Sequence, residues 1–226
     1  MLKKIKKILL ILFFINLSAF SQKHPVFYGG VEGYLFPQSE NNVFAGISIG
    51  SQIYQFKFFA PEIGLDLYAG VVEQREINEG WPDATKLPDA LMKQDFRASV
   101  LTLNPKFKFG NEDAFITFSP KYHIGRITGR ARLYENRFDD GRFPLASNQT
   151  IKNRVAYWSF AVGFEGLNIS DRSWFALSLN LTQLNARDAW GEIDFQDPNV
   201  KLSSMSRTSI GMGIRFYYNP FASEND

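Results

Sequence analysis

Polar and apolar residues alternate along most of this chain. Between Lys106 and Phe118 the order is Lys-Phe-Lys-Phe, then Gly-Asn-Glu-Asp, then Ala-Phe-Ile-Thr-Phe. Alternation on both sides of a tight turn predicts a β-hairpin. The same pattern predicts eight strands, over residues 26–36, 43–57, 61–74, 96–109, 114–130, 153–167, 174–187 and 205–218. No stretch has a convincing helical periodicity, so the chain is predicted to be all-β.

The segments between these strands alternate in length. Those after the second, fourth and sixth strands are short, at residues 58–60, 110–113 and 168–173. Those after the third, fifth and seventh are long, at about 75–95, 131–152 and 188–204. Short turns at one end and long loops at the other predict an eight-stranded antiparallel up-and-down transmembrane β-barrel. The first gap, 37–42, is the exception, because it is short where a long loop is expected.

Each predicted strand has one large apolar face and one small or polar face, and alternation alone does not say which lies inside. A soluble ligand-binding barrel would turn the apolar face inward. Two features favour the opposite. The polar faces are rich in Gly and Ala, which suits a narrow lumen, and aromatic residues collect next to the short turns, as in an interfacial girdle. These aromatics are Phe27, Phe58, Phe59, Phe107, Phe109, Phe164, Trp174, Phe175, Phe216, Tyr217 and Tyr218.

The first 22 residues differ from the rest. Four lysines precede an apolar run from Ile8 to Leu17, and small residues follow at Ala19 and Ser21. This order is typical of a cleaved signal peptide, and the apolar run is too short to span a bilayer as a helix. We therefore divide the chain into a signal peptide over 1–22, a barrel over 23–221 and a short tail over 222–226.

Composition excludes several kinds of chemistry. The chain has no cysteine, which excludes disulfides, thiolate metal sites and a cysteine nucleophile. Its formal charge of +2 comes from the signal peptide, because the remainder carries 21 basic and 23 acidic side chains. We therefore expect no nucleic-acid partner. We also expect no cofactor and no metal, since Asp139-Asp140-Gly141 and Asp194 to Asn199 match no known calcium-loop spacing.

Taken with the amphipathic strands, the two ends of the chain support a resemblance. The segment Ala19-Phe20-Ser21-Gln22 and the closing Gly211-Met-Gly-Ile-Arg-Phe-Tyr-Tyr218 resemble those of small outer-membrane β-barrel proteins of Gram-negative bacteria, particularly the Bacteroidota kind. The resemblance implies a location in the outer membrane. It also implies outer-membrane lipid and lipopolysaccharide as partners, with other outer-membrane proteins as further candidates. The family's chains usually end on an aromatic that assembly factors read, and here Phe216, Tyr218 and Phe221 are all candidates.

Charged residues recur on the predicted lumen face. Because unpaired buried charges are strongly unfavourable, we expect these groups to form an ion-pair network that plugs the barrel. The alternative is an ion pathway, as in a porin-like channel, but an eight-stranded interior is just wide enough for side chains to fill. The network residues are Glu32, Glu62, Asp66, Lys106, Lys108, Lys121, His123, Glu165, Arg207 and Arg215.

A catalytic interpretation starts from His123. Some small outer-membrane barrels are lipid A deacylases or acyltransferases, and Ser119 shares the lumen face with His123. At about 3.3 Å per residue, however, Ser119 lies about 13 Å away along the strand, beyond hydrogen-bond reach. Ser99 and Ser159, on neighbouring strands, stay open as nucleophiles. We expect no enzyme and instead a structural, adhesive or accessory role, with the lipid A-modifying enzyme as the alternative.

The rim near the long loops is basic. Arginine forks suit phosphate, and the lipid A of the outer leaflet is phosphorylated. Acidic neighbours at Glu135, Asp139 and Asp140 leave a solvated loop with local ion pairs as an alternative. Lys152 and Arg154 belong to the same basic rim. The candidate lipid-phosphate contacts are Arg126, Arg130, Arg132, Arg137 and Arg142.

Overall fold

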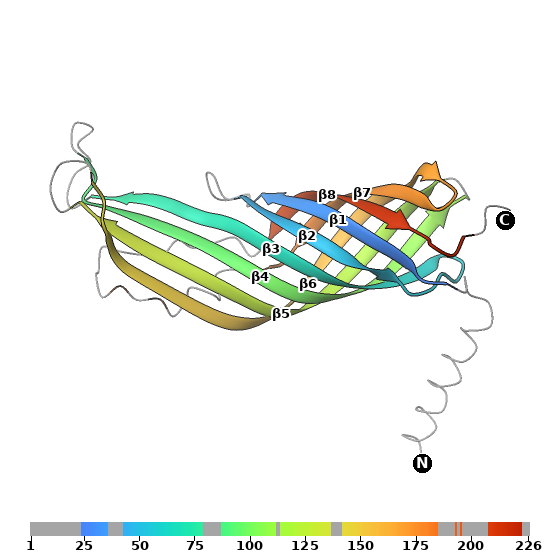
Figure 1. Cartoon of the computed structure of the whole chain (residues 1–226), viewed down its shortest axis with the longest axis horizontal. Coiled ribbons are helices and arrows are strands. Elements are labelled where there is room, and N and C mark those ends of the chain that lie inside the picture. Colours follow the sequence, from blue (N-terminus) through green and yellow to red (C-terminus); the bar gives the residue numbers. More distant parts are fainter. Residues whose placement is uncertain are drawn as a thin grey trace, which may run out of the picture.

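The protein is a closed barrel of eight antiparallel strands in the computed structural model (Figure 1). Every strand pairs with its neighbour in the chain, and β1 pairs with β8 to close the sheet. This confirms the predicted all-β, eight-stranded up-and-down architecture. The strands are β1 Val26–Leu35, β2 Val43–Gln52, β3 Phe59–Ile77, β4 Ala90–Gly110, β5 Phe115–Glu135, β6 Leu145–Ser170, β7 Ser173–Thr182 and β8 Ser209–Tyr218.

The structure describes residues 24–35, 43–78, 87–111, 114–136, 142–184, 193, 195 and 208–222. The predicted signal peptide over 1–22 lies outside this range, as does most of the predicted loop 188–204. Within the range, no helix has the length and apolar character needed to cross a membrane.

Four strands are much longer than the others. β3, β4, β5 and β6 have 19, 21, 21 and 26 residues, whereas β1, β2, β7 and β8 have 10 each. The long strands extend beyond the rest at the long-loop end (Figure 1). The predicted loops 75–95 and 131–152 were therefore wrong in their bounds, because pairing continues to Ile77↔Ala90 and Tyr134↔Leu145. We call this extension the projecting sheet.

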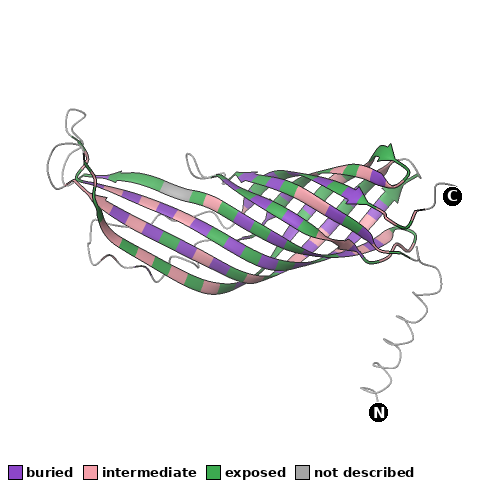
Figure 2. Ribbon diagram, in the orientation of Figure 1, coloured by how far each residue is buried: buried purple, intermediate pink, exposed green. Residues whose placement is uncertain are grey.

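In the part of the barrel formed by all eight strands, the apolar face lies outside. Figure 2 shows buried and exposed residues alternating along every strand. Val31, Leu179 and Met212 are 59%, 61% and 69% exposed, whereas Glu62 and Lys106 are buried. The alternative of a soluble barrel with its apolar face inside is wrong for this chain. The large apolar side chains lie on the outer face of the barrel wall, and the charged ones lie on its inner face.

This pattern inverts along the long strands. On the short-turn side the outward residues of β4, β5 and β6 are apolar, and on the long-loop side they are mostly polar, with basic residues prominent: Leu101, Ile124 and Trp158 give way to Arg97, Arg126 and Arg154. The inward residues change in the opposite sense, from Thr102, His123 and Ser159 to Ala98, Ile127 and Val155. All three strands change at one row of paired residues, Val100↔Gly125↔Val155. We call it the boundary row.

Inward glycines let aromatic rings lie flat inside this narrow barrel. A Cβ at Gly50 would lie 2.6 Å from the Tyr28 hydroxyl, and a Cβ at Gly46 would lie 2.5 Å from the Tyr68 ring. Contacts this short do not occur in packed proteins, so any side chain there displaces the ring. The Gly-rich inward faces are therefore the space into which Tyr28 and Tyr68 fold.

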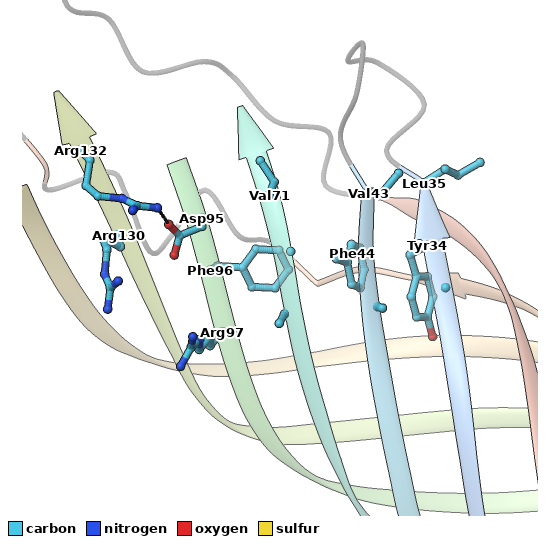
Figure 3. A pocket seen from close by; sticks show the side chains of 14 residues that line it. Tyr34, Leu35, Val43, Phe44, Val71, Asp95, Phe96, Arg97, Arg130 and Arg132 are labelled. Atoms are coloured by element: carbon cyan, nitrogen blue, oxygen red, sulfur yellow. Dashed lines mark hydrogen bonds and ion pairs between the residues drawn. The ribbon is translucent and has the colours of Figure 1, made fainter. Parts of the chain in front are cut away.

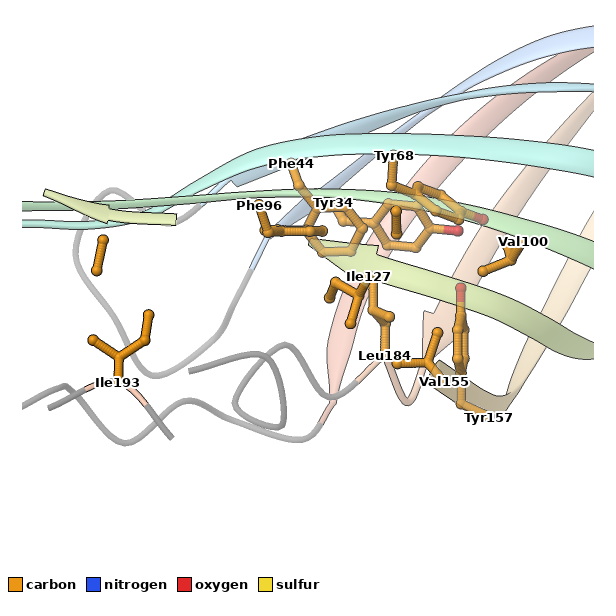
Figure 4. Close-up of a cluster of buried hydrophobic side chains, with 12 residues drawn as sticks. Tyr34, Phe44, Tyr68, Phe96, Val100, Ile127, Val155, Tyr157, Leu184 and Ile193 are labelled. Atoms are coloured by element: carbon orange, nitrogen blue, oxygen red, sulfur yellow. The ribbon is translucent and has the colours of Figure 1, made fainter. Parts of the chain in front are cut away.

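An apolar cluster lies inside the barrel at the boundary row and on its long-loop side, with Tyr157 on the short-turn side (Figure 4). The rings of Tyr34 and Phe44 stack face to face with centroids 4.5 Å apart, and Phe96 meets Phe44 edge to face at 5.5 Å. Leu184 and Ile193, from the segment after β7, pack against the same cluster. The described side chains therefore pack against one another across the barrel at this level.

Aromatic residues surround the short-turn end, but two members of the predicted girdle, Tyr217 and Trp174, lie inside the barrel instead. Phe27, Phe58 and Phe109 are 48%, 52% and 55% exposed on the outer wall. Tyr217, in contrast, is buried at 2% exposure, and its ring stacks on Trp174 inside the barrel at 5.5 Å. Alternation explains this, because Tyr217 shares the face of Arg215.

Candidate functional site: the charged barrel interior

Four carboxylates and four permanently charged bases occupy the lumen on the short-turn side of the apolar cluster. None of them is more than 6% exposed. They come from β1, β3, β4, β5, β6 and β8, and strand alternation points each of them inward. Arg207 lies outside the described residues. The eight charged residues are Glu32, Glu62, Asp66, Glu165, Lys106, Lys108, Lys121 and Arg215.

Glu165 on β6 binds two lysines of β4. Lys108 Nζ lies 2.6 Å from Oε1, and Lys106 Nζ lies 3.0 Å from Oε2. The indole nitrogen of Trp174 also donates to Oε1 at 2.9 Å. Lys108 and Glu165 line a cavity of ≈ 240 Å³ near the turn between β6 and β7, so this is the end of the network nearest to solvent.

Glu62 on β3 is the most heavily bonded carboxylate. It accepts hydrogen bonds from Lys106, from Arg215 Nη1 at 3.1 Å, from the Tyr217 hydroxyl at 2.8 Å and from Asn104 Nδ2 at 2.8 Å. Two cations and two neutral donors thus surround one buried carboxylate. A charge taken out of water is tolerated only with such saturation of its lone pairs.

Glu32 on β1 completes the chain of contacts. It accepts from Arg215 Nη2 and from Lys121 Nζ, each at 3.1 Å, and from the Tyr34 hydroxyl at 2.7 Å. Arg215 therefore bridges Glu32 and Glu62. Tyr34 also belongs to the apolar cluster, so the charged and apolar parts of the interior are in direct contact.

Little space remains between these groups. The cavity bounded in part by Lys106, Lys121, Glu165 and Arg215 has a volume of ≈ 20 Å³. This is room for about one water molecule. These charged side chains therefore lie close together at this level of the barrel.

His123 on β5 lies at the edge of this network. Its Nε2 is 2.6 Å from Ser159 Oγ, its Nδ1 is 2.8 Å from Thr102 Oγ1, and Thr102 donates to Asp66 at 2.5 Å. The ring also stacks on Tyr157 at 4.5 Å. Ser159, one of the two neighbouring-strand serines left open by the sequence, is thus the histidine's partner. Asp66 Oδ2 lies 3.5 Å from the same Nδ1.

Serine, histidine and aspartate therefore meet in the order of a hydrolytic triad, but they meet in the wrong place. Ser159 is 3% exposed, and His123 and Asp66 are each 1% exposed. An acyl substrate must come within bonding distance of a nucleophilic oxygen. The enclosed geometry instead links the two ring nitrogens of His123 to the hydroxyls of Ser159 and Thr102, which is the ordinary role of a buried histidine.

The predicted basic contacts lie on the opposite, outer face of the wall. Arg126 and Arg130 are exposed on β5, and Arg132 forms an ion pair with Asp95 of β4 (Figure 3). Arg142 is exposed just before β6, and Arg137 lies outside the described residues. Sequence reasoning missed Arg97, whose outward place follows from the alternation Arg97, Ser99, Leu101.

Sequence reasoning also missed the neutral members of the network. Thr102 and Asn104 lie on the same face of β4 as Lys106, so their positions could have been read from the alternation. Which carboxylate each one binds depends on the register of β3 against β4. Among the described residues, no group of three or more His, Cys, Asp or Glu side chains could hold a metal ion.

Comparison with known proteins gives structural likeness only. No family model and no curated protein matches the chain. The solved structures that resemble it include Ail, the attachment invasion locus protein of Yersinia pestis (10% identity, TM-score 0.37, covering 88% of this chain and 95% of that one); the N-terminal β-barrel domain of Pseudomonas aeruginosa OprF (12%, 0.33, 86% and 98%); and Neisserial surface protein A (9%, 0.37, 88% and 97%). Likeness at this level does not assign the chain to a family.

Proposed function

We propose that this chain is an integral outer-membrane β-barrel, exported through a cleaved signal peptide, with a non-catalytic structural, adhesive or accessory role. The boundary row is the observation that carries the proposal. A sheet in water turns apolar residues inward, and a small barrel in lipid turns them outward. Both patterns occur along β4, β5 and β6, and they change at the same row, as expected where one wall passes from lipid into water.

The energetics of the outer wall support the same proposal. Each large apolar side chain removed from water contributes about 1.5–3 kcal/mol, and soluble monomers rarely expose apolar patches larger than a few hundred Å². Here all eight strands carry exposed apolar residues on their outer face, from Val31 on β1 to Ile214 on β8. Lipid contact removes the cost of that surface. The aromatics next to the short turns fit the girdle of such a barrel.

Heat-modifiable gel migration tests the membrane assignment. We expect the protein to require detergent for extraction and to migrate as a compact form until it is boiled. A protein that stays soluble without detergent would contradict the proposal. The same proposal includes a Bacteroidota-type origin for the chain, and it takes other outer-membrane proteins as candidate partners. Copurification from native membranes tests for such a partner.

The packing of side chains inside the barrel supports a plugged lumen and a role without conduction. The charged network and the apolar cluster occupy successive levels of the interior, and the cavity within the network is ≈ 20 Å³. We therefore expect little or no single-channel conductance in planar bilayers. Steady ion conductance by the wild-type protein would favour the porin-like alternative and would exclude the plugged lumen.

The contact between His123 Nε2 and Ser159 Oγ, 2.6 Å, is the one observation that favours a lipid A-modifying enzyme. Burial of both residues weighs against it. We expect His123→Ala to leave the mass spectrum of lipid A unchanged in cells that produce the protein. A lipid A species that depends on the wild-type protein and disappears in His123→Ala and Ser159→Ala would establish the enzyme instead.

A further inference from the structure

Thr128, on the outer wall of β5, is surrounded by four cations. Arg97 on β4 and Lys152 on β6 lie directly opposite it on the two flanking strands. Arg126 and Arg130 lie two residues away on its own strand, facing the same side. All four basic side chains are exposed. Cross-strand and next-but-one neighbours on one face of a sheet are within reach of long side chains, so these five residues form one surface, which we call the Thr128 cluster.

The cluster has no internal source of negative charge. Arg126 lies directly opposite Arg154, and like charges at such positions are destabilising. Among the described residues, Arg97, Arg126, Arg130, Lys152 and Arg154 form no ion pair, and the nearby Asp95 is bonded to Arg132. Asp95 lies directly opposite Arg130 but pairs with Arg132, so this stretch of the described wall concentrates positive charge without ion-pair partners.

An apolar track leads to this cluster. A groove of ≈ 840 Å³ crosses the outer wall of β1 to β5, with Val43 and Val71 among its apolar lining and Arg97 and Arg130 at one side (Figure 3). A second groove of ≈ 520 Å³ continues toward the short turns, lined by Ile47, by Leu67 and again by Arg97. Ala45 and Ala69 line both grooves, and their small side chains keep the floor low.

Arg97 therefore stands where a cationic surface meets an apolar groove. It lines both grooves, it belongs to the Thr128 cluster, and it lies just beyond the boundary row. A ligand that fits both features carries phosphate at one end and an alkyl chain at the other. Several arginine forks around one point favour a headgroup with more than one phosphate.

We propose that the Thr128 cluster binds the phosphorylated headgroup of lipid A, with an acyl chain of the same molecule in the groove between Ile47 and Leu67. The proposal rests on the membrane assignment above and identifies one lipid that binds to the outer face of the barrel. The phosphates contact the four basic side chains of the cluster, Arg97, Arg126, Arg130 and Lys152. The Thr128 hydroxyl donates a hydrogen bond to a phosphate oxygen. Bound phosphate neutralises the facing Arg126 and Arg154.

Native mass spectrometry of the barrel released from detergent tests this. The probes are bisphosphorylated lipid A, monophosphoryl lipid A and phosphatidylglycerol, each added to the full chain. We expect bisphosphorylated lipid A to be retained best, monophosphoryl lipid A less and phosphatidylglycerol least. The double variant Arg97→Gln with Lys152→Gln should lower the affinity for lipid A by about tenfold or more, because charge-assisted hydrogen bonds are lost. Lys57→Asn, which removes a cation at the short-turn end and suits the left-handed backbone there (φ 50°), serves as the control.

Three results would overturn the proposal: retention of lipid A by the double variant at the wild-type level, equal retention of phosphatidylglycerol, or displacement of lipid A by inorganic phosphate. Heat-modifiable migration of each variant shows that its barrel is folded. A wild-type chain that does not insert into bilayers contradicts the membrane assignment itself. A chain that inserts but does not discriminate between these lipids contradicts only the lipid A site.

Discussion

Arg215 of β8 donates a hydrogen bond to Glu32 of β1 at 3.1 Å, across the pair of strands that closes the barrel. Gly30 faces Arg215 in this pairing, and a Cβ there would lie 2.7 Å from Arg215 Cγ. The first and last strands are thus joined by backbone pairing and also by a buried ion pair. Because Arg215 bonds Glu62 of β3 as well, the closure of the barrel and the packing of its lumen are coupled.

Replacing Arg215 by methionine is expected to destabilise the folded barrel by about 3–5 kcal/mol, because Glu32 and Glu62 each lose a buried cation. The double variant Arg215→Met with Glu32→Gln is expected to recover part of this loss, since the described network then holds three carboxylates and three lysines and its net charge returns to zero. Denaturant unfolding followed by the gel shift measures both. Equal stability of Arg215→Met and wild type would show that the network does not hold the barrel closed.

Gly50 and Gly29 make a matched pair for testing the packing of the lumen. Gly50→Ala places a methyl group against Tyr28 and is expected to cost about 1–3 kcal/mol through overpacking. Gly29→Ala points outward, where nothing lies within 4 Å of the new Cβ, and is expected to be close to neutral. The same unfolding assay compares them. A larger loss for Gly29→Ala would contradict the assignment of inside and outside.

Leu179 tests what surrounds the outer wall. In a bilayer, Leu179→Arg is expected to lower the stability of the inserted barrel by about 2–4 kcal/mol, whereas an exposed arginine in water costs almost nothing. Gln74→Arg, on the exposed face of the projecting sheet, is the control and is expected to change stability little. The free energy of folding into lipid vesicles is the measurement. Tolerance of arginine at both positions would indicate that Leu179 faces water.

The barrel could be predicted from the sequence, but the projecting sheet could not. On β7 and β8, large apolar residues such as Leu177 and Ile214 occupy every second position, and this period alone predicts the two strands. Residues 90–96 also alternate, but in the opposite sense, with Met92 and Phe96 inside and Lys93 outside. The outward apolar period ends at the boundary row, so the sequence predicts loop for the residues of the projecting sheet.

The lumen residues followed from alternation, but their partners did not. A period of two places Glu62, Lys106 and Arg215 on inward faces. The contact between Arg215 and Glu62 joins residues 153 positions apart, and it depends on the stagger of eight strands around the barrel. The contact of His123 with Ser159 likewise depends on the register of β5 against β6, which pairs Ser159 with Lys121. Only the closed sheet supplies these relationships.

The most direct test of the lipid-facing wall uses spin labels on β6, because the chain contains no native cysteine. Val162→Cys and Lys152→Cys lie on the same outward face, on opposite sides of the boundary row. After reconstitution in bilayers, we predict that a label at 162 is accessible to oxygen and shielded from a water-soluble nickel complex. A label at 152 should show the reverse. Equal access of the nickel complex to both positions would contradict the account, because the outer wall would then face water along its whole length.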